Sequence, residues 1–418
     1  MVEQRVNSSV PETPKPEKKR LESLDAFRGL TIFVMVFVIV VAGYRNLPQK
    51  MSWFGSVPIS TWNHADVGWE RFAEEKKAEG LSEEEIAQLP EARLKNIGCT
   101  ITDLVAPFFV FIVGLCIPLS RARRGADWWR HVISRTVMLI LAGVLYISLI
   151  LGLSWWWGIL QAIGIAYFMG VASMKLSRKG RWVAIFAILA FHMLMSHYVH
   201  WWLHFGETTE PFWKISQPDG NWAKPLIVHC RPWVSISYGV MTMIGVLVGE
   251  SLISRDRKTI TKQALTLGAV FMVVGYAVHK IGFITGQMGL CFNKPDVTAS
   301  YAMFTSGIGA WTFLLIYYIM DVWGYRKWAS PLVVFGKNAL LAYFMQIIMR
   351  IFFRALQIED FFKGRNDTLV RWAEMLPSLE TLLLSKSGYY GVFWGLLWTF
   401  CLWLCVLYCN RKNIYWKL

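Results

Sequence analysis

The stretch SLDAFRGLTIFVMVFVIVVAG, at residues 23–43, decides what kind of protein this is. From Leu30 to Gly43 it is almost wholly apolar, whereas Asp25 and Arg28 stand at its threshold. Ionisable side chains are costly to place in lipid. Because these two are three residues apart, they share one helical face and can pair. They are either an anchor reaching back to the membrane surface or the opening of a polar site inside a helical bundle.

The rest of the composition agrees with a membrane protein. Of 418 residues, 55% are hydrophobic and only 17% are charged, and the mean hydropathy is +0.38. Apolar runs of about 20 residues recur along the chain and predict transmembrane helices. The alternation of apolar and polar residues that is typical of β-barrel strands is not seen. The fold class predicted is therefore all-α, a polytopic integral membrane bundle.

The apolar runs predict about ten transmembrane helices. An even number places both termini on the same side of the membrane. The predicted spans are 24–44, 101–119, 131–151, 157–174, 182–198, 234–253, 264–283, 301–320, 332–353 and 392–409.

The basic residues gather in alternate short connections between these spans, which predicts the sidedness. Cytoplasmic loops carry the excess of Lys and Arg, so both termini are expected in the cytoplasm, and the protein in the inner, cytoplasmic membrane. Residues 1–22 are polar and basic and predict a disordered cytoplasmic tail. This arrangement accounts for the net charge of +15 without nucleic acid, which we do not expect as a partner. The long connections then lie outside the cytoplasm.

The first long connection contains a helical insertion at about residues 65–98, expected on the extracytoplasmic side. Ser82, followed three residues later by Glu85, is the signature of a capping box. The insertion is acidic and charged, and we assign it no chemistry.

Several polar residues are candidates for chemistry. His64 stands in TWNHADVG and would act as a general base or a nucleophile, although a loop histidine is often without a special role. Asp103 opens the second span and is either an interfacial residue favoured by the helix dipole or a functional buried carboxylate. Gln161, in GILQAIGIAYF, must find a partner at membrane depth, by default on another helix.

Further candidates lie in the second half of the chain. Asn293 and Lys294 come just before the eighth span, and Asn338 lies inside the ninth as helix glue or substrate contact. The spacing of His197, His200 and His204 suits zinc, but no nearby carboxylate completes a site, and we expect no metal. Cys401, Cys405 and Cys409 lie four apart along the last span and are either packing residues, the interpretation that we favour, or a soft-metal site. The loop positions of Cys99, Cys230 and Cys291 are compatible with a disulfide among them.

The order of these motifs resembles the transmembrane acyltransferases typified by heparan-α-glucosaminide N-acetyltransferase, including their bacterial relatives. The similar pieces are SLDAFRGLTIFVMVFV, the segment from His64 to GCTITDLVAPFFVFIVGLCIPLS, GILQAIGIAYF, FNKPDVTASY, FGKNALLAY and the terminal RKNIYWKL. The resemblance covers about residues 23–418 and implies one transmembrane acyltransferase-like domain there.

The resemblance also implies an activity: transfer of an acetyl or acyl group from cytosolic acetyl-CoA, a co-substrate, to an amino sugar or related glycan on the extracytoplasmic side. His64 and Asp103 match the catalytic positions. Contacts to substrate or CoA would come from Asp25, Arg28, Gln161, Asn293, Lys294 and Asn338. This chain departs from the family pattern at Ile39, where an asparagine is usual, and at Ala162, where an arginine is usual.

The partners expected are thus acyl-CoA, a sugar or glycan acceptor and the lipid bilayer, and the sequence is compatible with a homodimer. In this reading His64 either accepts the acyl group or takes a proton from the acceptor. Two other classes stay open. The same polar residues would suit a multi-pass transporter of a small solute or lipid-linked sugar, and Ile39 and Ala162 would suit an inactive relative serving as a scaffold.

Overall fold

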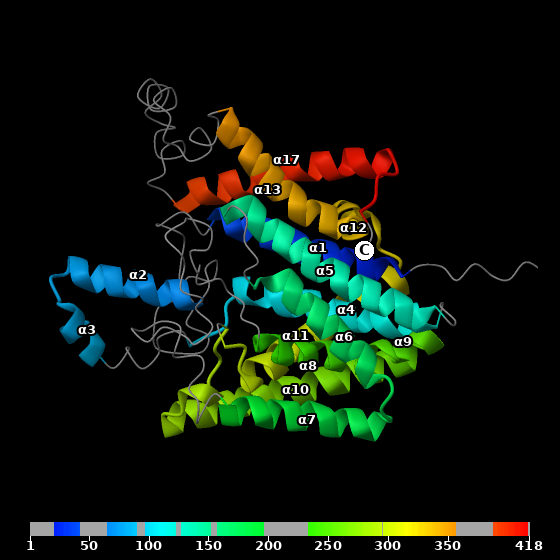
Figure 1. The fold of residues 1–418 in the computed structure, drawn as a ribbon, viewed down its shortest axis with the longest axis horizontal. Helices are drawn as coiled ribbons and strands as arrows, with labels where there is room; N and C mark the ends of the chain where they lie inside the picture. The colour runs from blue at the N-terminus through cyan, green and yellow to red at the C-terminus, as the bar shows by residue number, and fades with distance from the viewer. Residues whose placement is uncertain are drawn as a thin grey trace, which may run out of the picture.

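The structure is a computed structural model that describes residues 21–41, 65–89, 97–122, 127–151, 157–195, 233–294, 296–356 and 388–416. Within these ranges the chain forms helices joined by short connections, and no strand (Figure 1). The main bundle consists of α1 (Glu22–Val41), α4 (Val105–Arg121), α5 (Trp128–Leu151), α6 (Ile159–Ser173), α7 (Arg178–Leu194), α8 (Val234–Gly249), α10 (Arg257–Thr285), α11 (Ala299–Tyr317), α12 (Ser330–Lys337), α13 (Ala339–Ala355) and α17 (Gly388–Arg411).

Seven of the described helical segments are long and apolar enough to cross a membrane. They are Glu22–Val41, Thr102–Arg121, Trp128–Leu149, Val234–Ser254, Arg257–Thr285, Ala299–Val322 and Val392–Arg411. The predicted span 332–353 is instead two helices, α12 and α13, bent by 76° where they meet at Asn338. Counted as one broken span, this pair would be an eighth.

The two remaining predicted spans are shorter helices. The apolar helix α6 has 15 residues, and α7 has 17 and begins with the basic residues Arg178, Lys179 and Arg181. The predicted all-α membrane class is confirmed. The count of ten spans is not confirmed and stays a prediction, because α6 and α7 fall short of the roughly 20 apolar residues that a membrane requires.

The central helix of the bundle is α8, whose residues are almost all buried. Small residues bring it close to α4: a Cβ added to Gly114 would lie only 2.9 Å from the Cα of Gly245. Lipid tails are as apolar as the helices, so no hydrophobic force drives helices together inside a membrane. Close approach instead gives van der Waals contact between them, which larger residues would prevent. The α4–α8 contact therefore forms the core on which the other helices pack.

The first helix packs against α12 and α17, which follow much later in the chain (Figure 1). A Cβ on Gly29 would overlap the backbone oxygen of Leu332, and one on Gly336 would overlap that of Asp25. Both positions therefore require glycine. This close crossing fixes where the side chain of Arg28 lies.

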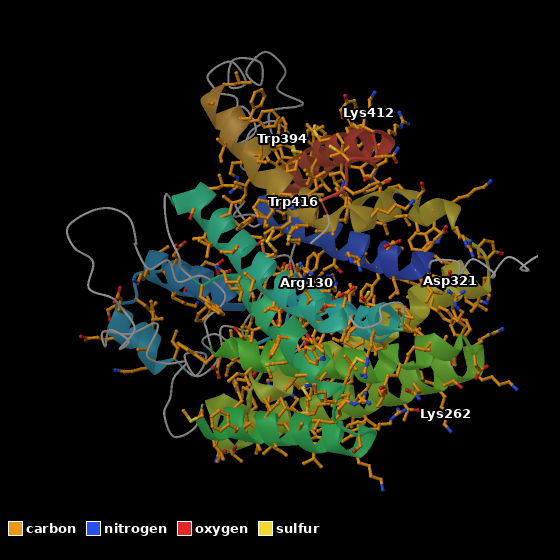
Figure 2. All side chains as sticks on the ribbon, turned by 45° about the vertical axis from the view of Figure 1, so that its right-hand side comes forward. Arg130, Lys262, Asp321, Trp394, Lys412 and Trp416 are labelled. Carbon is orange, nitrogen blue, oxygen red and sulfur yellow. The ribbon has the colours of Figure 1, made fainter. Side chains whose placement is uncertain are left out.

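The basic connections meet at one end of the bundle. Arg121, at the end of α4, donates to Met174 O at 3.3 Å, and Arg178, at the start of α7, donates to Gln263 at 3.0 Å. Arg181 pairs with Glu250 at 2.6 Å. Lys262 and Lys412 mark this end in Figure 2. Connections assigned to one side from sequence are thus neighbours in space, while the side of the membrane they face stays a prediction.

Two shorter helices, α2 (Ala65–Ala78) and α3 (Glu83–Gln88), lie at the opposite end, on the left in Figure 1. The predicted capping box is confirmed: Glu85 N donates to Ser82 Oγ at 3.2 Å, and Ser82 N donates to Glu85 Oε2 at 2.7 Å. The hydrogen bonds that Ser82 N and Ser82 Oγ donate to the Glu85 carboxylate lower its pKa. Phe72 and Ile86 are buried apolar residues of these helices.

Candidate functional site

The most concentrated group of buried polar residues begins just before α4. Asp103 is fully buried, and its Oδ2 accepts hydrogen bonds from Thr100 N at 2.9 Å and Thr100 Oγ1 at 2.8 Å. A short 3-10 turn, η2 (Thr102–Leu104), joins this loop to α4. Local bonds of this kind let Thr and Asp organise a helix start. Asp103 is thus a buried carboxylate, while the functional role that the sequence suggested for it stays a prediction.

The other carboxylate oxygen of Asp103 faces Lys294. The Lys294 Nζ lies 3.6 Å from Asp103 Oδ1, and the two side chains are only 5% and 0% exposed. The hydroxyl of Tyr301 donates to the backbone oxygen of Asp103. Taking two charges out of water is costly, and their attraction and hydrogen bonds must offset this cost. Removing either partner would take the opposite charge away from the other inside the bundle.

Backbone contacts join the same two segments. Gly98 N donates to Phe292 O at 2.9 Å, and Ile97 forms an isolated antiparallel bridge with Asn293. The segment leading into α4 and the segment leading into α11 are thereby held together. Two motifs far apart in the sequence, GCTITD and FNKPDVT, therefore form one structural unit.

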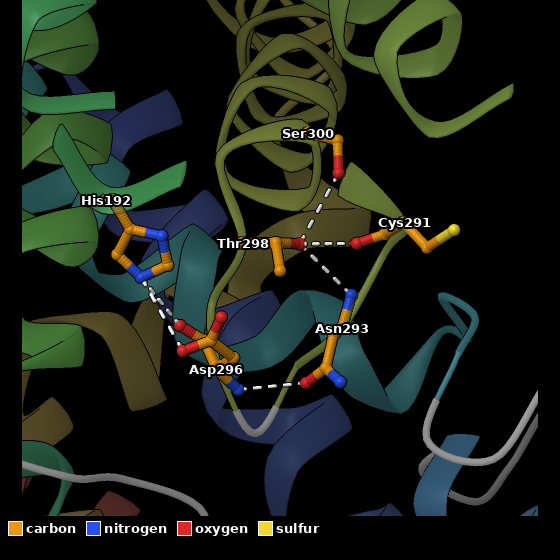
Figure 3. A network of polar contacts seen from close by, with 6 residues as sticks. All are labelled: His192, Cys291, Asn293, Asp296, Thr298 and Ser300. Carbon is orange, nitrogen blue, oxygen red and sulfur yellow. Dashed lines mark hydrogen bonds and ion pairs between the residues drawn. The ribbon is translucent and has the colours of Figure 1, made fainter. Parts of the chain in front are cut away.

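The loop before α11 is organised by its own polar side chains (Figure 3). Thr298 Oγ1 donates to Cys291 O at 2.7 Å and accepts from Asn293 N at 3.2 Å, and Asn293 Oδ1 accepts from Asp296 N at 2.9 Å. Val297 adopts a φ of 52°, which is strained for a β-branched residue. Asn293 thus holds the loop that carries Lys294.

Two buried histidines flank this loop. The Nε2 of His192, on α7, lies 3.0 Å from Asp296 O and 3.7 Å from Asp296 Oδ1 (Figure 3). On α10, the Nδ1 of His279 accepts a hydrogen bond from Phe292 N at 3.0 Å. The rings of His279 and Phe292 stack with their centres 4.1 Å apart. Sequence reasoning missed His192, His279 and Asp296. The sequence signal that could have identified His192 is its place as an ionisable residue inside an apolar run.

Gln161 is buried at the start of α6. Its Oε1 accepts from Gly158 N at 3.0 Å, so the amide caps its own helix. The sequence predicted a partner on another helix, and Gln161 packs against α5 where Gly143 has no side chain. Trp157 beside it donates to Ser235 Oγ on α8 at 3.1 Å.

The predicted pairing of Asp25 and Arg28 is confirmed. Arg28 Nη1 lies 3.5 Å from Asp25 Oδ1 and donates to Gly336 O at 3.3 Å, while Nη2 contacts Cys116 Sγ at 3.4 Å. Arg28 lies in the first half of α1 and touches the last part of α4, whereas Asp103 precedes α4. The pair and Asp103 are therefore at opposite ends of α4.

Asn338 lies at the bend between α12 and α13 and binds the C-terminal segment. Its Nδ2 donates to Ile414 O at 2.8 Å and to Asn410 Oδ1 at 3.3 Å, and its Oδ1 accepts from Trp416 N at 3.1 Å. These bonds use both N–H groups of the amide. The structure thus places Asn338 as a clamp between two motifs, FGKNALLAY and RKNIYWKL.

Other predicted features can be placed only in part. His64, His197, His200, His204 and Cys230 lie outside the described residues. Cys99 and Cys291 are free thiols. Burial, above all, raises the pKa of Cys99 well above its usual value and that of Cys291 to about 11. Within the described ranges, no three or more His, Cys, Asp or Glu side chains are grouped to hold a metal ion.

Comparison with known proteins gives one distant similarity. No family model matches the chain. Over 172 residues, it is 30% identical to heparan-alpha-glucosaminide N-acetyltransferase of Mus musculus. The aligned region is 38% of this chain and only 20% of the mouse protein, so the chain spans about a fifth of the relative that it matches. The similarity suggests a transferase related at a distance to that N-acetyltransferase.

Proposed function

We propose that this protein is a membrane-embedded acyltransferase that moves an acetyl or other acyl group from cytosolic acyl-CoA to an amino sugar or related glycan on the extracytoplasmic side. The observation that carries the proposal is the buried Asp103–Lys294 pair, 3.6 Å apart, which joins two motif segments at the end of the bundle opposite the basic connections. The distant similarity to an N-acetyltransferase supports the reaction class.

The donor side of the proposed site is the basic end. Acyl-CoA carries phosphates, and guanidinium groups bind phosphate through paired charge-assisted hydrogen bonds. Arg28 is the proposed donor contact, because its side chain is 28% exposed although it lies among helices. Asp25, which is buried beside it, positions that guanidinium.

The chemical step is proposed at the opposite end. The amine nitrogen of the acceptor attacks the thioester carbonyl carbon, a C–N bond forms and the C–S bond breaks. His64 takes the proton from the amine and passes it to the leaving thiolate, so that CoA departs as a thiol. In the two-step form, His64 itself attacks the thioester carbonyl, the C–S bond breaks and CoA leaves as a thiolate. The acceptor amine then attacks the acyl-histidine, the bond to the imidazole nitrogen breaks, and the proton lost by the amine goes to the thiolate.

Asp103 acts as a positioning residue in this proposal. It is fully buried and its oxygens are bound by Thr100 and Lys294, so it holds the chain that follows the insertion and does not meet the substrate. Asn293 holds the Lys294 loop in the same way. Gln161 shapes the nearby start of α6, and Asn338 acts on the site only through the C-terminal segment.

The remaining elements of the proposal concern topology. The tail at residues 1–22 and both termini lie in the cytoplasm, residues 23–418 form the transmembrane acyltransferase-like domain, and the insertion at about 65–98 is extracytoplasmic. Cysteine accessibility in sealed vesicles tests this sidedness. A thiol introduced at Glu84 of α3, which is exposed, should react with an impermeant maleimide only from the extracytoplasmic face.

The test of function is release of CoA and formation of an acetylated product by purified full-length protein given labelled acetyl-CoA and a panel of amino sugars. His64→Ala and His64→Asn should lose at least about a hundredfold in rate, whereas His131→Ala, on α5, should not. Full transfer by His64→Ala would overturn the assignment of His64. Solute counterflow in liposomes without acyl-CoA, together with no CoA release, would instead establish the transporter.

A further inference from the structure

Two arginines lie against neighbouring residues of α4, away from the Asp103–Lys294 pair. Arg28, in the first half of α1, contacts Cys116 of α4. Arg135, in the first half of α5, lies over Tyr167, which packs in one apolar cluster with Ile117, the next residue of α4. Asp25 is the carboxylate that pairs with Arg28. In the low dielectric of a helical bundle, gathering two positive charges is costly.

The contacts of Arg28 leave its guanidinium incompletely bound. Its ion pair with Asp25 is 3.5 Å long, and its other contacts are a backbone oxygen, Gly336 O, at 3.3 Å and a thiol, Cys116 Sγ, at 3.4 Å. These distances are long for charge-assisted hydrogen bonds. Because 28% of the side chain is exposed, an incoming ligand can reach it.

Arg135 has no acidic partner in the described part of the chain. Its guanidinium carbon lies 4.8 Å from the centre of the Tyr167 ring, a cation–π contact. Its Nε is buried and has no hydrogen-bond partner among the described residues. A buried polar group without a partner costs free energy, and a ligand oxygen would supply the missing acceptor.

We infer that Arg28 and Arg135 together bind a phosphate or pyrophosphate group that enters from the basic end of the bundle. Two guanidinium forks and the single carboxylate of Asp25, which pairs with Arg28, leave a net positive charge. An anion neutralises this charge, and the planar fork matches phosphate geometry. The carrier of this phosphate is the acyl donor, an assignment that rests on the proposed function. Anion binding itself does not depend on it.

The position of Arg28 and Arg135 suits a long acyl donor. Cys116, which contacts Arg28, follows Asp103 by 13 residues, a separation of about 20 Å along a helix. A ligand whose phosphates bind the arginines must therefore extend by about that length, past most of α4, to present its reactive group near Asp103. A nucleotide joined to its thioester through a long flexible arm has this shape.

The test compares ligands with and without phosphate on full-length protein in phosphatidylcholine nanodiscs. Binding of CoA, pyrophosphate and pantetheine is measured by calorimetry for wild type, Arg135→Gln and Arg130→Gln. Arg130 is the matched control, an exposed arginine at the start of the same helix. Arg135→Gln should weaken CoA and pyrophosphate about tenfold and leave pantetheine unchanged, and Arg130→Gln should change each by less than about twofold.

Equal weakening of pantetheine by Arg135→Gln, or equal effects of the two variants, would overturn the inference. If Arg135→Gln does not fold, Arg135→Lys keeps the charge without the fork and should still weaken CoA more than pantetheine; no such difference would also overturn it. Phosphatidylglycerol added to the nanodiscs identifies the source of the phosphate. If this lipid competes with CoA, and the competition requires Arg135, the site would be assigned to lipid headgroups. Arg135-dependent CoA binding without any acetyl transfer would sustain this site and refute the proposed function.

Discussion

The ammonium group of Lys294 lies 3.6 Å from the carboxylate of Asp103, and neither side chain is accessible to solvent beyond a few per cent. One residue precedes α4 and the other precedes α11, so the pair fixes the relation between two helices that also contact each other directly. Because both groups are charged and buried, the pair is a sensitive point of the structure.

Breaking this pair from one side should destabilise the protein strongly. Lys294→Met or Asp103→Asn leaves a buried charge without its partner, at a cost of about 3–5 kcal/mol. The double variant should lose much less than the sum of the two single losses, since no charge remains uncompensated. Denaturant unfolding in detergent measures the free energy of unfolding of the wild type, the two single variants and the double variant. Lys258→Met, at an exposed lysine of α10, is the control. Additive losses would show that the two side chains do not interact.

Cys99 and Cys291 should resist alkylation at neutral pH. Burial raises the pKa of Cys291 from its usual 9.0 to about 11, so its reactive thiolate is about a hundredfold scarcer than that of a normal cysteine. Its labelling should therefore rise only as the pH approaches 11. Single-cysteine variants labelled with iodoacetamide test this, against a cysteine placed at the exposed Glu84. Labelling of Cys291 as fast as this control would contradict its burial.

Loss of the Asn338 amide should free the C-terminal segment. Asn338→Ala removes three hydrogen bonds to residues 410–416, which should cost about 1–3 kcal/mol. Trypsin should then cleave faster after Lys412. The exposed neighbour Lys337 provides the control, because Lys337→Ala alters the same helix end without touching the segment. Equal cleavage rates in Asn338→Ala and wild type would refute the clamp.

The crossing of α1 and α12 should not tolerate a methyl group. In Gly336→Ala the new Cβ would overlap the backbone of Asp25, and overpacking of this kind typically costs about 1–3 kcal/mol. Gly180→Ala, near the start of α7, meets nothing closer than 3.3 Å and should be neutral or slightly stabilising. Thermal unfolding of the two variants measures the difference. Unchanged stability of Gly336→Ala would mean that the helices can separate without loss.

Local features of this fold could be predicted from sequence, and long-range ones could not. The apolar runs located the helices, the spacing of Asp25 and Arg28 predicted their pairing, and Ser82 with Glu85 predicted a cap, because each depends on neighbours within a helical turn. The pairing of Asp103 with Lys294 depends on tertiary packing. No spacing rule shows which of several lysines meets a given carboxylate.

The bend at Asn338 shows a second limit. Residues 332–353 are predominantly apolar over a length that suits a single span, which predicts one helix. The bend of 76° arises where Asn338 leaves the helical conformation, with ψ at 42°, and turns its amide to the C-terminal segment. The same contact agrees with helix glue, one of the two roles that the sequence left open for Asn338, the other being a substrate contact. Hydropathy reports burial but carries no information about such a partner.

The crossing of α1 with α12 also has a consequence for biogenesis. Arg28 reaches Gly336, which lies 308 residues later in the chain, so the ribosome completes the first helix long before its neighbours exist. Chains are made from the N-terminus at about 5–20 residues per second. During that interval of many seconds, the charge of Arg28 has only Asp25 to balance it as α1 enters the bilayer. A chain lacking Asp25 should therefore be lost chiefly during insertion, as a target of membrane quality control, before its finished fold is tested.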